Sequence, residues 1–329
     1  MPVLSVQHVT TYKYRRPVAF GEHRMMFRPR DSAGQRVLSW TTHITPEPSA
    51  LRSVVDAFGN VVTLASFTHR ARELRVENSL VVEHRPSRPD PAEFTPYARL
   101  WPFSYDLDDM ADLAPVMHRH YADPEHRVDD WARSFLANRR GTLDLLVAMT
   151  RDIRHGFAYL PRYEEGVQDP ARTLALRAGT CRDYALLMIE AVRALGMAAR
   201  FVTGYIYSPS VEGRVNQGGG ATHAWVEVFV PGAGWIEFDP TNGIVGSRDL
   251  IRVASVRDPR QAVPLSGTWT GFPADSLGMT VSVHVNSDEQ AQPPAGGPGE
   301  ADIVNFAPRS RPAPGGEATS GPAARCAIG

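Results

Sequence analysis

One of the chain's two cysteines stands at the start of a predicted helix. Cys181 opens the apolar stretch CRDYALLMIEAVRAL, Thr180 before it is the expected N-cap, and Asp183 completes a capping box. Gly196 lies where a glycine typically follows the last turn. The first turn of a helix stabilises a thiolate and offers a free N–H group to an oxyanion. Cys181 is therefore a candidate nucleophile, although most free cysteines are simply small buried side chains.

A histidine and an aspartate follow on two predicted strands. The stretch THAWVEVFVPGAGWIEFDPTNG predicts a strand, a turn and a second strand, with His223 at the start of the first strand and Asp239 at the end of the second. In thiol acyl transfer a histidine takes the thiol proton, and an aspartate holds the imidazole and stabilises its cation. Alone, each has an ordinary explanation, as a strand histidine and a turn aspartate. Together with Cys181 they form a candidate Cys-His-Asp triad.

The triad constrains the turn between these strands. Side chains alternate faces along a strand, and a regular four-residue loop would put Asp239 on the face opposite to His223. An odd loop or a β-bulge that pairs Val230 with Gly234 places Asp239 diagonal to His223. We therefore predict such a turn, with Asp239 accepting a hydrogen bond from a ring nitrogen of His223.

The predicted register carries an electrostatic cost. It places Glu237 directly opposite Glu227, and like charges in that position repel. We expect Arg182 or Arg200, or exposure to water, to relieve the repulsion.

Two aromatic residues are further candidates for the site. Tyr159, upstream of the cysteine, is placed to donate a second hydrogen bond to an oxyanion, or else serves packing alone. Trp225 shares a strand face with His223, so it either shields the site from water or is simply part of the core.

Composition limits the function classes. The chain has 329 residues, 43% of them hydrophobic, and a formal charge of −1, which is a soluble globular profile with no bulk attraction for nucleic acid or an anionic membrane. Neither C-x-x-C, H-E-x-x-H nor an EF-hand loop occurs, so we expect no metal and no cofactor. The N-terminus lacks the pattern of a signal peptide, which predicts a cytoplasmic protein. The oligomeric state is left open.

The pattern of elements predicts an α+β protein with four segments. Residues 1–86 hold short strands typical of an antiparallel sandwich or barrel, and the proline-rich residues 87–106 are a predicted linker. Residues 107–286 are assigned to the catalytic core with a C-terminal strand. Residues 287–329 are rich in Pro, Gly and Ala and are predicted to be a disordered tail.

The two core windows carry a resemblance to a known family. The stretch GTCRDYALLMIEAVRALGMAARFVTGY, followed by HAWVEVFVPGAGWIEFDPTNG, resembles the core of the transglutaminase-like superfamily. HVTTYKYRRPV, MMFRPR and DAFGN resemble segments of the N-terminal β-rich domain of its bacterial branch. The resemblance implies a papain-like core with Cys181, His223 and Asp239 as the triad, and a protein or peptide substrate.

These features favour a cysteine enzyme that attacks a carboxamide or peptide carbonyl and forms a thioester. Water as the acceptor makes it a peptidase or amidase, whereas an amine makes it a transglutaminase, and the sequence leaves this choice open. The alternatives are a non-catalytic protein-binding module that retains the fold, and a metallohydrolase. No spacing typical of metal ligands supports the metallohydrolase.

Overall fold

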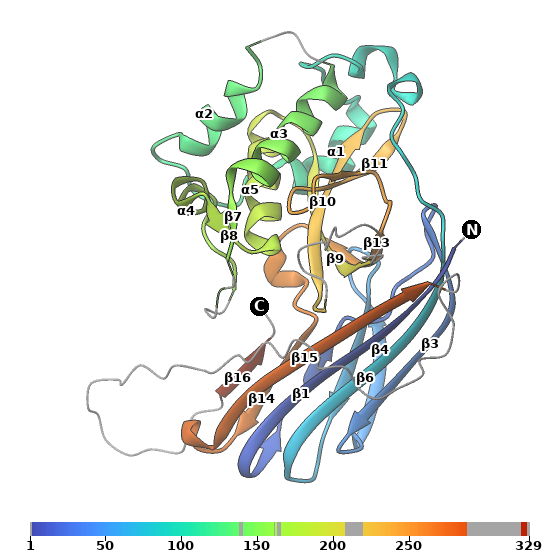
Figure 1. The fold of residues 1–329 in the computed structure, drawn as a ribbon, viewed down its shortest axis with the longest axis vertical. Coiled ribbons are helices and arrows are strands. Elements are labelled where there is room, and N and C mark those ends of the chain that lie inside the picture. The colour runs from blue at the N-terminus through green and yellow to red at the C-terminus, as the bar shows by residue number, and fades with distance from the viewer. Residues whose placement is uncertain are drawn as a thin grey trace.

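The computed structural model describes residues 2–137, 141–160, 162, 166–207 and 220–287, and the backbone of residues 324–327. Helices gather at one end of the molecule and long strands at the other, with a smaller sheet between them (Figure 1). This arrangement confirms the predicted α+β class with a β-rich N-terminal region.

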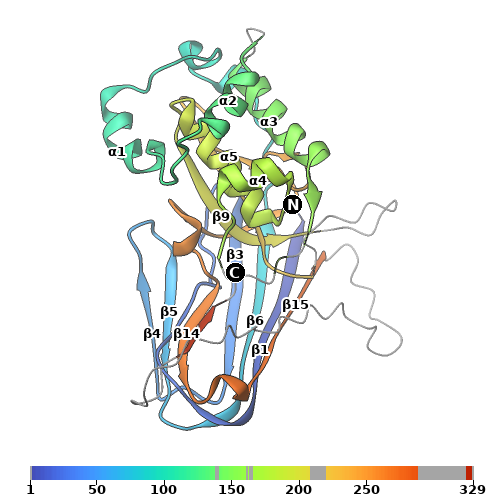
Figure 2. The same ribbon diagram turned by 90° about the vertical axis from the view of Figure 1, so that its left-hand side faces the viewer.

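The long strands form a two-layer β-sandwich (Figure 2). One layer has the order β3-β6-β1-β15, and the other continues from the end of β1 through β14, β2 and β5 to β4. The strands are β1 (Val3–Phe20), β2 (His23–Met25), β3 (Gln35–Thr45), β4 (Ala50–Val55), β5 (Val61–Ser66), β6 (Ala71–His84), β14 (Leu265–Thr270), β15 (Ser276–Ser287) and β16 (Ala324–Ala327).

Strict alternation fixes which face of β6 is buried. Leu74, Val76, Leu80 and Val82 all lie in the core of the sandwich, as their shared parity predicts. β6 pairs antiparallel with β1 from Val3 opposite Glu83 onward. A slip of one residue would turn the whole apolar set to solvent, so burial specifies this register.

The sandwich also contains strands from the C-terminal part of the chain. β14 pairs with β1 and β2, and β15 pairs with β1 along its length. The assignment of the strand before residue 287 to the catalytic core is therefore wrong. Met279, Val281 and Val283 lie in the sandwich core, and the one-faced pattern of β15 could not show which sheet it joins.

The predicted disordered tail is corrected at both ends. Ser287 is buried at the end of β15, and residues 324–327 form β16, which pairs with β14. The remainder of the predicted tail lies outside the described residues.

The rest of the chain builds a five-stranded antiparallel sheet covered by helices. Its strand order is β12-β11-β10-β9-β13. The elements are α1 (Leu107–Met117), α2 (Arg127–Ser134), α3 (Thr142–Gly156), β7 (Ala158–Tyr159), α4 (Pro170–Leu176), β8 (Ala178–Gly179), α5 (Cys181–Ala194), β9 (Ala199–Ile206), β10 (His223–Val230), β11 (Gly234–Asp239), β12 (Ile244–Val245) and β13 (Leu250–Val256), with the 3-10 turns η1 (Pro91–Glu93), η2 (Pro96–Ala98), η3 (Pro259–Gln261) and η4 (Pro273–Asp275).

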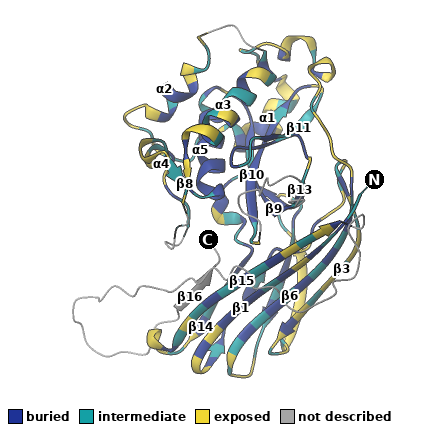
Figure 3. Cartoon of the chain, in the orientation of Figure 1, coloured by how far each residue is buried: buried dark blue, intermediate teal, exposed yellow. Residues whose placement is uncertain are grey.

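Helix α5 is the centre of this half of the molecule. Every residue from Cys181 to Arg193 is buried, and Figure 3 shows α5 and β10 as largely buried elements. Gly196 has a φ of 80° just past the helix end, as expected for the glycine of a left-handed C-terminal cap. A helix enclosed on all sides is a rigid support for the residue at its first turn.

A buried histidine connects the sandwich to the five-stranded sheet. His8 of β1 is fully buried, and its Nδ1 and Nε2 are hydrogen-bonded at 2.9 Å to the Tyr205 hydroxyl of β9 and to Thr10 Oγ1, respectively. Tyr205, Ile251 and Val253 of the five-stranded sheet pack into the sandwich core. Burial lowers the pKa of His8 to about 3.

Replacing Val281 with aspartate tests whether β15 belongs to the sandwich. Val281→Asp places a charge in the sandwich core, and we expect a loss of several kcal/mol in the free energy of unfolding. Asn286→Asp, at an exposed position of the same strand, should change it by less than about 0.5 kcal/mol. Urea unfolding measures both. A cooperative transition of wild-type stability for Val281→Asp would contradict the assignment.

His8 makes stability sensitive to acid. Its pKa is about 3 in the folded protein and about 6.5 when unfolded, so the unfolded chain binds the extra proton between these values. The free energy of unfolding therefore falls as pH drops from 6.5 towards 3, by up to about 1.4 kcal/mol per pH unit. In urea titrations from pH 7 to 4, the stability gap between wild type and His8→Gln should narrow with falling pH. A constant gap would exclude this role of His8, and the exposed control His284→Gln should keep the wild-type pH dependence.

Candidate active site

Cys181 occupies the first position of α5 and keeps 6% of its surface exposed. The helix start is fixed by Asp183, whose Oδ2 accepts 2.9 Å hydrogen bonds from the backbone N–H and the hydroxyl of Thr180. Arg162 pairs with the same carboxylate at 2.9 Å, and the backbone N–H of Gln168 donates to it at 2.7 Å. The predicted capping box is thus present, and it forms part of a larger buried ion pair.

His223 and Asp239 meet at the neighbouring ends of β10 and β11. His223 Nε2 lies 2.8 Å from Asp239 Oδ2, and both side chains are buried. The strands pair Val230 with Gly234, so the loop has three residues. The predicted odd loop and the predicted His223–Asp239 hydrogen bond are both confirmed.

The turn after β11 holds the Asp239 carboxylate in place. Its Oδ1 accepts a 2.8 Å hydrogen bond from the Thr241 backbone N–H, and its Oδ2 accepts one of 2.8 Å from Asn242 Nδ2. Asn242 Nδ2 also lies 3.4 Å from His223 Nε2. Asn242 was not among the predicted site residues, although an asparagine three residues after an aspartate in a D-P-T-N turn can predict such a contact.

Asp239 determines the protonation of His223. Burial alone would lower the pKa of the imidazole, but the adjacent Asp239 carboxylate and the Cys181 thiol outweigh it and raise that pKa to about 10. Burial likewise opposes the charge on Asp239, and the pKa of its carboxyl nevertheless falls below the usual range because of His223 and the turn hydrogen bonds. His223 Nδ1 makes no hydrogen bond within the described part of the chain. The raised pKa favours the charged imidazole at neutral pH, with the Asp239 carboxylate in direct contact with it.

Trp225 lies against His223 as the shared strand face predicts. The two rings stack at 6.0 Å between centroids and 27° between planes, and Trp225 is completely buried. Gly204 of β9, opposite His223, makes this packing feasible, because a Cβ there would lie 2.8 Å from the indole and 2.0 Å from the Ile251 carbonyl oxygen. The indole therefore covers one side of the imidazole.

Tyr159 reaches Cys181 through a short parallel pairing. β7 pairs with β8 so that Tyr159 lies opposite Gly179, two residues before the cysteine. The Cys181 thiol, followed by burial, raises the pKa of the Tyr159 hydroxyl far above its usual range, and the Cys181 backbone N–H partly offsets this rise. The Tyr159 hydroxyl thus stays protonated beside the Cys181 thiol and the Cys181 backbone N–H, which is the predicted donor to an oxyanion.

The predicted opposition of two glutamates is also present. Glu227 pairs with Glu237 across β10 and β11, and Arg200 Nε contacts Glu227 Oε2 at 2.5 Å, as expected. Arg252 Nη1, which the sequence analysis missed, contacts Glu227 Oε1 at 2.7 Å. Burial and the neighbouring Glu227 raise the pKa of Glu237 to about 8, so one carboxyl of the pair keeps its proton at neutral pH.

Arg182 does not join this network. Its Nη2 donates to the Pro259 carbonyl oxygen at 2.9 Å, and its guanidinium lies over the Phe201 ring. The expectation that Arg182 relieves the glutamate pair is wrong, because the Arg182 side chain points to η3 and not to the glutamates of β10 and β11.

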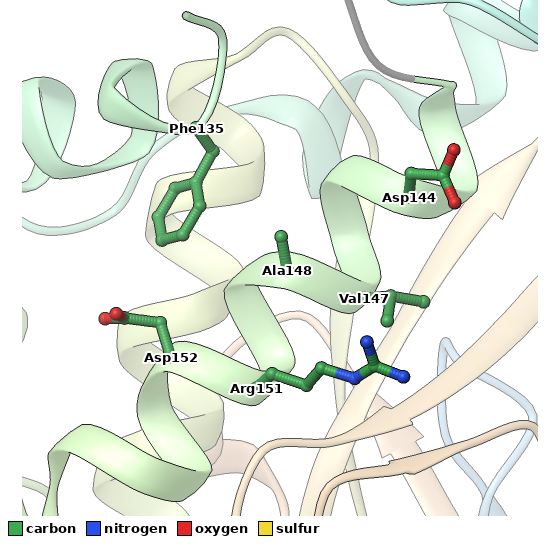
Figure 4. Close-up of a pocket in the computed structure, with 6 residues that line it drawn as sticks. All are labelled: Phe135, Asp144, Val147, Ala148, Arg151 and Asp152. Carbon is green, nitrogen blue, oxygen red and sulfur yellow. The ribbon is translucent and has the colours of Figure 1, made fainter. Parts of the chain in front are cut away.

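A hollow of about 640 Å³ lies elsewhere, on the outer face of α3 (Figure 4). It is lined by Phe135, Asp144, Val147, Ala148, Arg151 and Asp152. Asp152 is engaged there by Trp131 Nε1 at 3.1 Å, and none of the candidate triad residues lines the hollow. It therefore plays no part in the site.

Metal binding and membrane insertion are addressed by the part of the chain that the structure describes. No three His, Cys, Asp or Glu side chains there gather in a way that suits a metal ion. No helix of that part has the length and apolar character needed to cross a bilayer.

Two family models match the chain. A model of the bacterial transglutaminase-like N-terminal region matches residues 4–83, and a model of the transglutaminase-like superfamily matches residues 129–240. Together they cover more than half of the chain. The second range contains Cys181, His223 and Asp239.

Similar proteins agree with these matches. An uncharacterized protein of Mycobacterium tuberculosis is 28% identical over 269 residues, which are 80% of this chain and 86% of that protein. A protein-glutamine gamma-glutamyltransferase of Pseudomonas aeruginosa is 37% identical over 79 residues, only 22% of this chain and 11% of that protein. A solved structure from Cytophaga hutchinsonii, described as a candidate cysteine protease, has a TM-score of 0.65, with 19% identity over 92% of this chain and 96% of that chain.

The likeness to the Cytophaga structure extends over the sandwich and the five-stranded sheet together, so it supports the fold as a whole. The family matches add what the fold alone does not. The chain belongs to the transglutaminase-like superfamily, in the bacterial branch with an N-terminal β-rich region.

Proposed function

We propose that the protein is a cysteine enzyme that transfers the acyl group of a peptide or carboxamide through a thioester on Cys181. One observation carries this proposal: the His223 imidazole contacts the Asp239 carboxylate at 2.8 Å and also interacts with a thiol at the first turn of a buried helix. A nucleophile, a base beside it and a group that orients the base are the parts that acyl transfer requires.

The first half of the reaction uses the imidazolium as an acid. The thiol proton resides on His223, and the Cys181 thiolate attacks the carbonyl carbon of the substrate. The resulting oxyanion accepts hydrogen bonds from the Cys181 backbone N–H and the protonated Tyr159 hydroxyl. When the tetrahedral intermediate collapses, His223 gives its proton to the leaving amine and the thioester remains.

The second half regenerates the enzyme. His223 takes a proton from water or from an acceptor amine, which attacks the thioester carbonyl and releases Cys181 as a thiolate. Water gives a carboxylic acid, and an amine gives a new amide. The name of the Pseudomonas relative favours a test for amine transfer, although that match spans a small part of either chain.

Cys181→Ala tests the proposed nucleophile. Casein and a biotinylated amine serve as the probe pair, and biotin incorporation and ammonia release are followed in parallel. Loss of the nucleophile should reduce both products by several orders of magnitude, while circular dichroism stays unchanged. Wild-type enzyme trapped with acid should carry a thioester on the peptide that contains Cys181, seen by mass spectrometry.

The second cysteine provides a matched control. Cys326→Ala should retain activity, and iodoacetamide should modify Cys181 before Cys326 at pH 6. A Cys181→Ala variant with more than about a tenth of wild-type turnover would exclude the thioester route. A wild-type protein that binds peptides without ever forming an acyl-enzyme would favour the alternative, a non-catalytic binding module.

Asp239→Asn tests the role of the aspartate. The substitution removes the charge that contributes most to raising the pKa of His223, while burial still lowers it, so the imidazole pKa should fall from about 10. An NMR titration of the His223 ring measures this shift, and turnover should fall because the imidazolium is less stable. Asp249→Asn, in an exposed ion pair with Arg248, is the control and should leave the His223 pKa at about 10. An unchanged pKa in Asp239→Asn would refute the assignment.

A cytoplasmic location remains part of the proposal. Reducing conditions there keep a nucleophilic thiol free of disulfides. Fractionation of cells with an antibody against the protein tests it.

A further inference from the structure

A second polar cavity lies where the sandwich meets the five-stranded sheet. It measures about 150 Å³ and is lined by loop residues of the sandwich, among them Arg30 and Asn60, and by Arg200, Arg252 and Ser255 of β9 and β13. It is separate from the triad, because none of Cys181, His223 and Asp239 lines it.

The three arginines that line this cavity use few of their guanidinium donors within the described part of the chain. Arg30 Nη1 donates to the Gly59 carbonyl oxygen at 2.5 Å, Arg200 uses Nε and Arg252 uses Nη1 for Glu227. Among the described residues, these are the hydrogen bonds and ion pairs of the three guanidinium groups. Each group therefore keeps two further nitrogens for a ligand.

Buried Glu227 sets the positions of two of these groups. It is 1% exposed, and its Oε2 also accepts a 3.1 Å hydrogen bond from Ser255 Oγ. The Arg200 guanidinium stacks 4.0 Å over the Trp235 ring, which restricts it further. Arginines held in this way lose little entropy when a ligand binds.

The charge balance favours an anion. Three arginines and Asp31 line the cavity, and the Glu227 carboxylate pairs with two of these arginines, Arg200 and Arg252. Asp31 is already engaged by the Val37 backbone N–H at 2.7 Å. The surplus of one positive charge is concentrated on donors whose forked geometry fits oxyanions.

We propose that this cavity binds a phosphate dianion. Sites for whole organic ligands typically enclose about 300–1,000 Å³, so a cavity of this size suits a single phosphate-sized group. A tetrahedral dianion can accept from three guanidinium groups that approach from different elements, which a planar monoanionic carboxylate cannot do equally well. Bound phosphate would connect a loop of the sandwich to the five-stranded sheet.

Calorimetric titration with inorganic phosphate tests the proposal on the full-length protein at constant ionic strength in a zwitterionic buffer. We expect one saturable site in wild type, and binding weakened at least about tenfold in Arg30→Gln and Arg252→Gln, since each loses charge-assisted hydrogen bonds. Arg248→Gln is the matched control, because that arginine is 75% exposed and pairs with Asp249 outside the cavity. It should bind phosphate as wild type does.

Three results would overturn the proposal: absence of saturable binding in wild type, equal binding in wild type and Arg30→Gln, or acetate binding as tightly as phosphate. Arg252→Gln removes one partner of buried Glu227 and can destabilise the fold. Arg30→Gln leaves both ion pairs of Glu227 in place, so it decides the outcome alone. The readout is binding, and it is independent of whether the protein proves to be an enzyme.

Discussion

The register of the β10–β11 hairpin is the constraint on which the rest of the site depends. Its three-residue loop brings Asp239 to the face that carries His223, where the two side chains meet at 2.8 Å. The same register sets Glu227 opposite Glu237, because parity moves every side chain of a strand together. A protein that places an aspartate beside this histidine must therefore also accommodate two facing carboxyl groups. The contact between His223 and Asp239 at one end of the hairpin is therefore linked to the repulsion between Glu227 and Glu237 in its middle.

That cost is met by the junction with the sandwich. Arg200 and Arg252 neutralise Glu227, and Gln35 of β3 fixes the backbone of Arg252 through hydrogen bonds of 3.0 and 2.7 Å. Asn60, in the loop before β5, similarly exchanges hydrogen bonds with the backbone of Ser255. The N-terminal region is thus more than an added domain, because Gln35 and Asn60 hold the β13 residues that stabilise the five-stranded sheet. β14 and β15 come after the five-stranded sheet in the chain and pair with β1 in the sandwich, so they connect the C-terminal part of the chain to its N-terminal part (Figure 1).

The sequence revealed the parts of this structure that local rules control. The cap of α5 and the glycine after it follow from residue types at fixed spacings. The odd hairpin loop, and with it the pairing of Glu227 with Glu237, follows from the requirement that Asp239 share a strand face with His223. It did not reveal where β15 pairs, because alternation tells which residues face a core but not which core. It also missed Arg252 and Arg162, since partners far apart in the chain leave no local pattern.

The electrostatics of the hairpin explain why Asp239 has the largest influence among the hairpin carboxyl groups on the charge of the imidazole. Trp225 lies between His223 and Glu227 on the same strand face, and Glu237 faces Glu227. Were both glutamates charged, their field would also stabilise an imidazolium. Glu227 is instead neutralised by two arginines, and the pKa of Glu237 is raised to about 8 by burial and by Glu227, so Glu237 is mostly neutral at pH 7. Among the carboxyl groups of the hairpin, the one in direct contact is then the dominant charge at His223, so the cation on the histidine depends chiefly on its hydrogen bond to Asp239.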